Sequence, residues 1–437
     1  MRNLANIGKQ IAQTQYAGVQ VGGSEGLESI LEEVSVEAMQ IEGDNALCAD
    51  LENVVGSLES IADQAAASIE DGGLDRQAAG LLEVAVESHM ARVGLSAQDS
   101  VASLESFGGT GTRVEATQVS VEAIKDKAKQ LWDFLVKKFQ EARQKVFAWF
   151  KKVFSGAAML KKRAEGIAKK AVDKKGTKKD DQEEIKLGGA AKALAGKDGK
   201  ADIPALAGDI KELAKVVDGV YRGHAKRVGD FGGDVAGLLD KVAGAPKEDL
   251  EGSDADKFFK SGKFMGEDVL AMLVTDFPDG ELLGGRTFVV AKADKAGDMT
   301  ELKSAIDKYN VEFTFPGDGK APKIADDQKF DAIEPGKVKD IAENIVVLAE
   351  SIIAFESDYF KHAKNLEKAD SAAEKVGKAF DKVSLGTAGA GAEKVSKSLY
   401  SAAQRANQNP VNQLTGSVLA TARAALEVCD KSLGQYE

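Results

Sequence analysis

The chain has 437 residues, of which 43% are hydrophobic, 29% charged and 6% aromatic. These proportions exclude a wholly disordered chain, and the length is sufficient for a large buried core. Its 2 cysteines, Cys48 and Cys429, lie far apart, so we expect no disulfide framework and synthesis in a reducing cytoplasm. No apolar segment of signal-peptide or membrane-spanning length occurs, so we expect neither export by that route nor a membrane span.

The net charge of −12 averages segments of opposite sign. Residues 1–122 carry 20 acidic and 5 basic side chains, a net charge of −15, whereas 123–437 carry 50 acidic and 53 basic ones. The basic excess is concentrated in 123–200, with 22 basic and 10 acidic residues. We therefore expect an acidic N-terminal segment at 1–122, a basic segment at 123–200 and a helical C-terminal region at 201–437.

In the acidic segment, residues 25–105 combine carboxylates with apolar residues at helical spacing, which predicts short amphipathic helices. Turn residues at Asp71–Gly73 and at Gly108–Thr112 separate these helices. The second loop closes the acidic segment, and we expect the last ten residues of the segment to be accessible.

The acidic segment also contains five Ser-x-Glu triplets, whereas the 13 serines of the remaining residues form none. Two of the triplets lie in the repeated pentapeptide Val-Ser-Val-Glu-Ala, at Val34–Ala38 and Val119–Ala123, and the surrounding sequence does not repeat. Isolated copies also match part of a helix-capping pattern, but a tripeptide repeated only in an acidic leader is typical of a protease signal. We interpret 1–122 as a propeptide of a precursor. The triplets are Ser35/Glu37, Ser57/Glu59, Ser68/Glu70, Ser103/Glu105 and Ser120/Glu122, the last followed by Ala123.

The strongest helical periodicity lies at 121–154 and predicts an amphipathic helix about 50 Å long. Such a helix packs into a bundle in most proteins, although an aromatic-rich basic helix also fits a membrane surface. Its apolar face includes Leu131, Trp132, Leu135, Phe139, Val146, Phe150 and Phe154.

A hydrophilic, lysine-rich stretch follows and runs to about residue 200. It is either a solvated face or a surface that neutralises phosphates and binds DNA without sequence preference. This basic patch comprises Lys161, Lys162, Arg163, Lys169, Lys170, Lys174, Lys175, Lys178 and Lys179.

The remaining residues predict a helical bundle with a small β-containing insert. A helical region at 203–242 has expected bends at Gly229, Gly232 and Gly233. Two strands flank a short helix in the insert, and long helices follow it. The fold class is therefore mainly α, with long amphipathic helices and a small α/β insert near 284–316. Its expected elements are strands at 286–292 and 309–315, and helices at 299–308, 337–382, 391–408 and 411–433.

No motif supports an enzyme, a cofactor site or a metal site. His89, His224 and His362 have no histidine at i+4 and no nearby cysteine, which excludes the usual metal-ligand spacing. The glycines at Gly108–Gly111 follow no predicted strand, and neither a phosphate-loop ending nor a Gly-x-Ser-x-Gly elbow occurs. We therefore expect a non-enzymatic protein without a cofactor.

With its acidic leader and its triplets, the chain resembles the internal head proteins of phiKZ-like giant tailed phages. The segment Tyr359–Lys368 and the two predicted strands also resemble parts of that family's body. The resemblance implies a virion protein, synthesised in the host cytoplasm, whose propeptide the phage prohead protease removes after Ser-x-Glu motifs. The final cut would fall at Glu122–Ala123, with Glu105–Ser106 next.

The resemblance also implies partners and a location. The protein would lie inside the capsid with other inner-head or capsid proteins, in contact with packaged DNA, and would be ejected into the host. A leader with a net charge of −15 can cover a basic body and suppress premature DNA binding.

The sequence is compatible with two other functions. The helix at 121–154 could act on the host membrane as a membrane-active element, or the chain could be a bacterial helical scaffold that is never processed.

Overall fold

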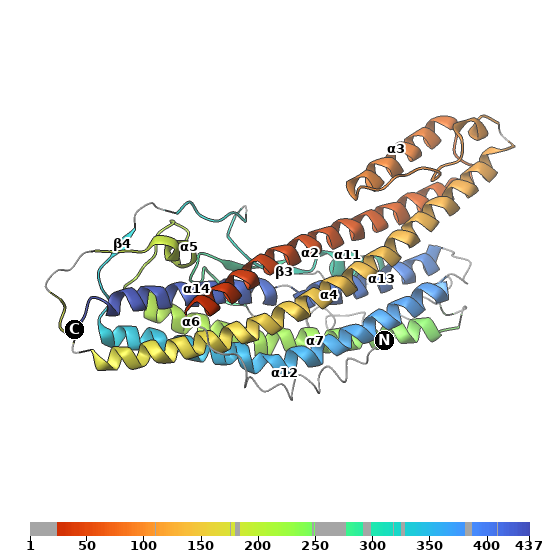
Figure 1. Ribbon diagram of the computed structural model, residues 1–437. Helices are drawn as coiled ribbons and strands as arrows, with labels where there is room; N and C mark the ends of the chain where they lie inside the picture. The colour runs from red at the N-terminus through yellow and green to blue at the C-terminus, as the bar shows by residue number, and fades with distance from the viewer. Residues whose placement is uncertain are drawn as a thin grey trace.

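Long helices lying side by side form the main part of the molecule (Figure 1). This architecture confirms the mainly α fold class with a small α/β insert. Within the described residues, no helix combines the length and the hydrophobicity of a membrane span. The computed structural model describes residues 24–109, 111–174, 176–179, 184–246, 249, 277–291, 299–317, 319–324, 328–380, 387–408 and 410–437.

Helix α4 is the longest helix that the structure describes. It spans Arg113–Asp173, 61 residues or about 90 Å, and so extends beyond both predicted ends of the helix at 121–154. The lysine-rich stretch was expected to be hydrophilic, and this expectation is wrong for its first part. Buried residues continue at helical spacing there, and packing against other helices stabilises these turns. The buried residues are Leu160, Ala164, Ile167 and Ala171.

The acidic segment forms one long helix and one short helix. Helix α2 spans Ser24–Ala67, 44 residues, where we expected shorter helices. Gly43 and Gly56 do not interrupt α2, because its apolar face packs continuously along α4 and offsets their low helix propensity. The predicted turn at Asp71–Gly73 is confirmed, and it leads into helix α3. α3 spans Arg76–Arg92, and the 3-10 helix η1 spans Leu104–Phe107.

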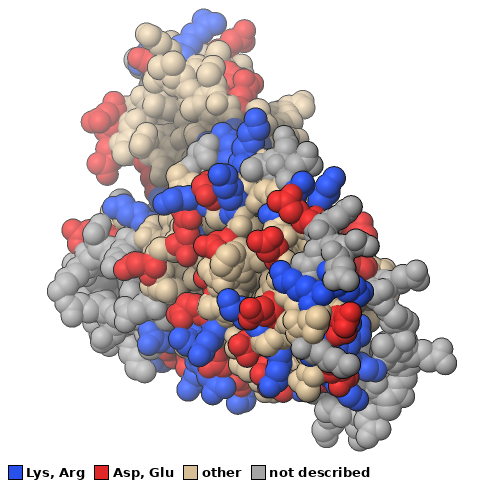
Figure 2. Space-filling model, turned by 90° about the vertical axis from the view of Figure 1, so that its left-hand side faces the viewer, with Lys and Arg blue, Asp and Glu red and all other residues tan. Residues whose placement is uncertain are grey.

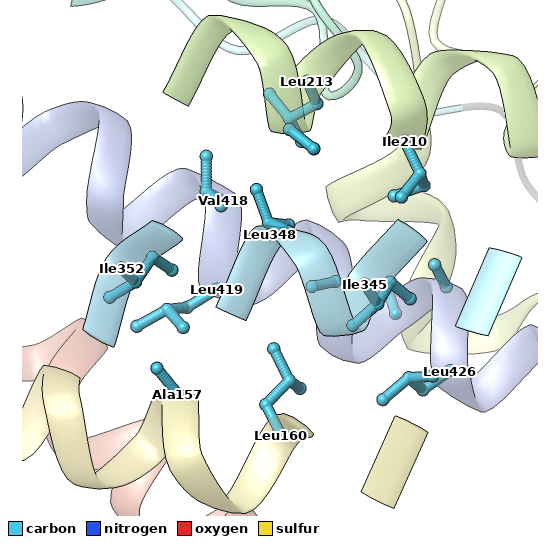
Figure 3. Close-up of a cluster of buried hydrophobic side chains, with 14 of the residues drawn as sticks. Ala157, Leu160, Ile210, Leu213, Ile345, Leu348, Ile352, Val418, Leu419 and Leu426 are labelled. Atoms are coloured by element: carbon cyan, nitrogen blue, oxygen red, sulfur yellow. The ribbon is translucent and has the colours of Figure 1, made fainter. Parts of the chain in front are cut away.

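Helix α12 contacts most of the other long helices of the body. It packs against α4, α6, α7 and α14, and the apolar side chains of α4, α6, α12 and α14 meet in one cluster (Figure 3). The three predicted C-terminal helices are confirmed to within a few residues at each end. Their bounds are Pro335–Phe380 for α12, Thr387–Gln408 for α13 and Val411–Leu433 for α14.

The predicted helical region at 203–242 is confirmed, but it is interrupted at a different place. Helix α6, Leu206–Gly219, passes into the π-helical segment η3, Val220–Ala225, and then into α7, Lys226–Gly244. The bends expected at Gly229, Gly232 and Gly233 are absent, and all three glycines lie inside α7. Two of them allow close packing against α12, because a Cβ on Gly229 would lie 1.6 Å from Nδ1 of His362 and one on Gly232 would lie 3.1 Å from Leu366.

The predicted α/β insert is confirmed as well. Strand β2, Thr287–Ala291, pairs antiparallel with β3, Asn310–Thr314, and helix α11, Met299–Lys308, connects them. A second small sheet pairs β1, Ile185–Lys186, with β4, Lys329–Phe330. It has only two residues per strand, too few for a period-2 pattern to predict. Two short segments follow β1, namely η2 at Gly188–Ala190 and α5 at Ala191–Leu194.

Candidate functional site: the acidic leader and its contacts with the body

We call residues 1–122 the leader and residues 123–437 the body. In the described part of the leader, helix α2 lies along α4 and also contacts α13 and α14. Seven carboxylates of α2 form ion pairs with cations of the body, distributed along the length of the helix. The pairs are Glu28 with Arg163 and Arg423, Glu33 and Glu37 with Lys152, Asp44 with Lys145, Glu52 with Arg405, Glu59 with Lys397, and Asp63 with Lys394.

The pair of Glu59 and Lys397 is the least exposed of these. The side chains are 14% and 11% exposed, and the distance from Lys397 Nζ to Glu59 Oε1 is 2.6 Å. Glu393 lies 2.7 Å from the same ammonium, which also sits 5.4 Å from the ring centroid of Trp132. Burial opposes the charged ammonium, but the two carboxylates outweigh it and raise the pKa of Lys397 above its usual range. Loss of Glu59 leaves this little-exposed ammonium with one carboxylate, Glu393, in place of two, and so weakens the compensation of its charge.

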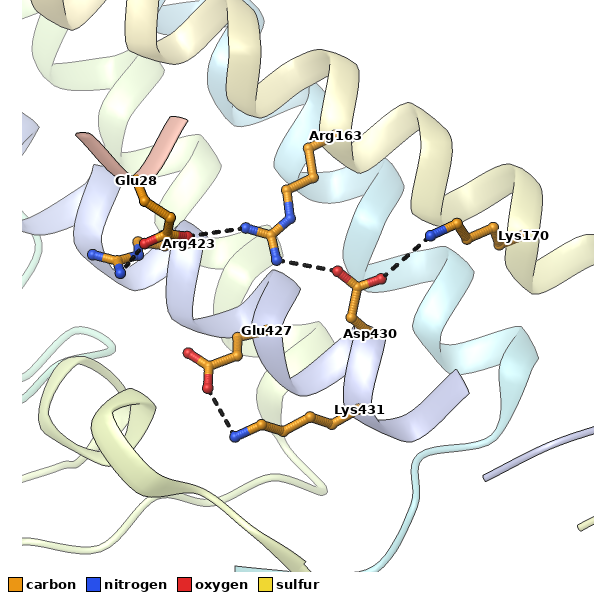
Figure 4. Close-up of polar contacts among 7 residues, drawn as sticks. All are labelled: Glu28, Arg163, Lys170, Arg423, Glu427, Asp430 and Lys431. Carbon is orange, nitrogen blue, oxygen red and sulfur yellow. Dashed lines mark hydrogen bonds and ion pairs between the residues drawn. The ribbon is translucent and has the colours of Figure 1, made fainter. Parts of the chain in front are cut away.

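At the other end of α2, Glu28 belongs to a network with the C-terminal helix α14 (Figure 4). Arg163 of α4 lies 3.4 Å from Glu28 and 3.1 Å from Asp430, and Lys170 lies 3.8 Å from the other oxygen of Asp430. Arg423 pairs with Glu28 from the side of α14. The network therefore connects the start of the described leader to both α4 and α14.

The predicted basic patch is largely engaged within the molecule. Lys161 lies 2.7 Å from Glu350, while Lys174 and Lys179 donate hydrogen bonds to the C-terminal backbone carbonyls of Tyr436 and Gly434. Lys178 forms an isolated β-bridge with Tyr436. At the end of the bundle seen in Figure 2, Lys and Arg are intermingled with Asp and Glu. The structure brings Arg163 and Lys170 together on Asp430 and leaves Lys162 and Lys169 exposed, while Lys175 lies outside the described residues.

Three of the five Ser-x-Glu triplets lie within helices. Those at Ser35 and Ser57 belong to α2, where Glu37 and Glu59 pair with Lys152 and Lys397. The hydroxyl of Ser57 donates to the Asn53 carbonyl. A protease binds its substrate as an extended chain. The peptide bonds after Glu37 and Glu59 are therefore protected while α2 is helical.

The triplet at Ser120 is also helical, and the accessibility that we predicted for the last ten residues of the leader is wrong for Ser120 itself. Ser120 is fully buried in α4, where its hydroxyl donates to the Ala116 carbonyl at 2.8 Å and accepts from the Ala102 amide at 2.9 Å. Glu122 is exposed, but Ala123 is half-buried. The reason is that α4 begins at Arg113, directly after the glycine loop, so the bond Glu122–Ala123 lies inside a helix.

The triplet at Ser68 lies in the turn between α2 and α3. Glu70, Asp71 and Gly72 are exposed, and both Gly72 and Gly73 have positive φ angles that end the helical path. Beyond the turn, the Leu74 amide donates to the Thr117 hydroxyl of α4 at 2.9 Å. The bond after Glu70 is therefore in an exposed turn between two fixed helices.

The triplet at Ser103 lies in the connection between α3 and α4. Ser103 and Glu105 are exposed at the start of η1, whereas Phe107 is fully buried and anchors the end of that segment. The bond Glu105–Ser106 thus lies in a single turn of 3-10 helix rather than in an α-helix.

The predicted amphipathic face of α4 lies in the core. All seven of its side chains are buried, and the aromatic ones contact partners on other helices, such as Phe150 against Tyr359 with a centroid distance of 4.1 Å. Two separate core clusters divide this face along α4. The buried residues are Leu131, Trp132, Leu135, Phe139, Val146, Phe150 and Phe154.

A groove of about 1480 Å³ lies between α2, α13 and the α11–β3 unit. Its lining mixes polar and apolar residues, and four of the polar ones have a buried side-chain atom without a hydrogen-bond partner among the described residues. Sequence reasoning missed the groove, because its walls come from elements that are distant in the chain. The four residues are Asn45, His89, Ser401 and Arg405.

The described residues contain no group of three or more His, Cys, Asp or Glu side chains placed to hold a metal ion. Of the three histidines, His224 and His362 are buried and His89 is partly buried. His224 lies in the π-helical segment with its ring 5.1 Å from that of Phe277, and His362 packs against Gly229. His224 and His362 therefore occupy the positions of residues that pack in the core.

The model of one protein family, the phiKZ-like phage internal head proteins, matches residues 27–431. No curated protein and no solved structure gives a significant match. The matched residues cover α2 as well as the body, so the leader helix and its ion-paired surface lie within the family match. The chain therefore belongs to the phiKZ-like phage internal head proteins and lies inside the capsid of the virion, in association with other head components.

Proposed function

We propose that the protein is made as a precursor and that the prohead protease cuts its acidic leader during head maturation. The body then remains inside the capsid as a structural component. Membership of an internal head protein family favours this structural role over an enzymatic one. The observation that carries the proposal is the position of two Ser-x-Glu triplets, at Glu70 and Glu105, in exposed connections between helices.

The order of cutting follows from the local structure. In the folded chain the bonds Glu105–Ser106 and Glu70–Asp71 are reached first, because neither lies in an α-helix. The bond Glu122–Ala123 needs the first turns of α4 to open. A cut at Glu105 aids that opening, because it frees the connection whose Ala102 amide bonds to Ser120. We therefore propose Glu122–Ala123 as a late cut.

The ion pairs support a second element of the proposal, that the leader shields the body. Cations on α4, α13 and α14 face carboxylates of α2, so their charge is neutralised in the precursor. A membrane role for α4 has less support, because its apolar side chains are used in the core of the bundle.

The test is co-expression with the prohead protease, followed by mass spectrometry of the new N-termini. We expect chains that begin at Ser106 and Asp71 early, and at Ala123 later. The variant Glu105→Gln should lose the Ser106 terminus, whereas Glu115→Gln, an exposed glutamate of α4 outside any triplet, should be cut like the parent. An unchanged intact mass after prolonged co-expression, together with an uncut leader in purified particles, contradicts the proposal.

A further inference from the structure

The surface of the body that lies under α2 is apolar as well as basic. Helix α2 buries a stripe of apolar residues along most of its length, and the indole nitrogen of Trp149 donates to the Val34 carbonyl at 2.8 Å. The buried residues of this stripe are Leu27, Leu31, Val34, Ile41, Cys48, Leu51, Val54, Val55, Leu58, Ala62 and Ala65.

The ion pairs of α2 flank this apolar stripe, and each joins a carboxylate of α2 to a cation of the body. The carboxylates of α2 meet lysines and arginines of three different body helices, at both ends and in the middle. Glu59 is the most deeply placed, on Lys397 of α13. A surface that combines an apolar stripe with bordering cations recognises an acidic amphipathic helix.

The covalent link between α2 and the body is separate from this interface. The connections that hold the exposed triplets lie beyond the C-terminal end of α2, around α3, which projects at one end of the bundle (Figure 1). A cut in either connection removes none of the contacts between α2 and α4, α13 or α14. Among the described residues, a groove also separates the flank of α2 from the insert.

We propose that the body carries a binding surface for an acidic amphipathic helix, and that α2 stays bound there as a separate chain after the connections are cut. This inference rests on the proposed function in one respect, namely that proteolytic processing cuts the connections around α3. The leader fragment is then a non-covalent subunit of the matured protein. The ends left at Glu70 or Glu105 follow the last residue of α2 in the chain, and both glutamates are exposed.

The experiment uses the full chain with a recognition sequence for an unrelated, sequence-specific protease inserted between the exposed residues Leu95 and Ser96, and with an N-terminal tag. After cutting, the two pieces should elute together in gel filtration at physiological salt. Separate elution of a folded body overturns the inference. Because the inserted site replaces the natural ones, the result does not depend on whether the prohead protease cuts the chain.

A charge variant tests the specificity of the surface. Glu59→Lys places a cation against Lys397, and should lower the fraction of leader retained after cutting and dilution at least about tenfold. The control Glu32→Lys changes an exposed carboxylate of the same helix for which no ion pair is found among the described residues, and should retain the leader like the parent. Circular dichroism of both uncut variants verifies that they fold. Equal retention by two folded variants overturns the charge recognition.

Discussion

At the scale of single residues, Asp370 is a buried charge with three polar partners. It is 5% exposed and pairs with Arg143 of α4, while the Tyr400 hydroxyl and the Gln404 amide of α13 each donate to it at 2.9 Å. Burial opposes the charged guanidinium, but the hydrogen bond and charge of Asp370 raise the pKa of Arg143. One carboxylate of α12 thereby links three helices.

Asp370→Ala should lower the free energy of unfolding by about 3–5 kcal/mol, because it leaves Arg143 buried without an opposite charge. The control Asp240→Ala removes an exposed pair with Lys375 and should cost less than about 1 kcal/mol. Urea denaturation measures both. Equal, small losses would show that the buried network does not stabilise the fold.

His362 gives a pH dependence with a defined sign. Burial lowers its pKa below the usual 6.5, and this outweighs the carboxylates of Asp358 and Asp230, which oppose the shift. The unfolded chain therefore takes up the proton more readily, so the stabilising contribution is present above pH 6.5 and is lost as the pH falls below it. Denaturation at pH 7.5 and 5.5 should show this loss. In His362→Asn, the free energy of unfolding should differ less between the two pH values. An equal difference in the variant and the parent would mean that other groups cause the pH dependence.

At the scale of elements, the packing of α7 on α12 depends on Gly229. A Cβ at this position would lie 1.6 Å from His362, so Gly229→Ala should destabilise the protein by roughly 1–3 kcal/mol. Gly237→Ala in the same helix meets open space and should stabilise it by about 0.5–1 kcal/mol through helix propensity. Thermal unfolding of the two variants should shift in opposite directions. Two shifts of the same sign would contradict the close packing of α7 on α12.

The elements that could be predicted from the sequence are those with a local signal. The periodic apolar face of α12, with Ile341, Ile345 and Leu348, predicts that helix, and the turn residues around β2 and β3 predict the insert. The pairing of Glu59 with Lys397 could not be predicted, because these residues are 338 positions apart and no local pattern joins them. The burial of Ser120 could not be predicted either, because its hydroxyl accepts from the Ala102 amide in the preceding connection, and helical periodicity gives no sign of that contact.

At the scale of the whole molecule, one part of the leader is packed on the body and another part is accessible to a protease. Its helix α2 is integrated along the bundle through apolar burial and ion pairs, whereas α3 and its two connections project at one end (Figure 1). Segments with few buried contacts open at low free energy, while those in the core open only with global unfolding. The parts of the leader therefore differ in local stability: the triplets at Ser35, Ser57 and Ser120 lie in the packed helices α2 and α4, whereas those at Ser68 and Ser103 lie in the connections around α3.

A glutamate-specific endoprotease should resolve this difference without any phage protease. In limited digestion of the native chain, we expect cutting after Glu105 and Glu70 well before cutting after Glu37, Glu59 and Glu122, because the last three lie in α-helices. Mass spectrometry of timed samples gives the order. In denaturing urea, which melts the helices, the five sites should be cut at similar rates. Early cutting after Glu59 in the native chain would mean that α2 is not held on the body, and would remove the basis for a retained leader.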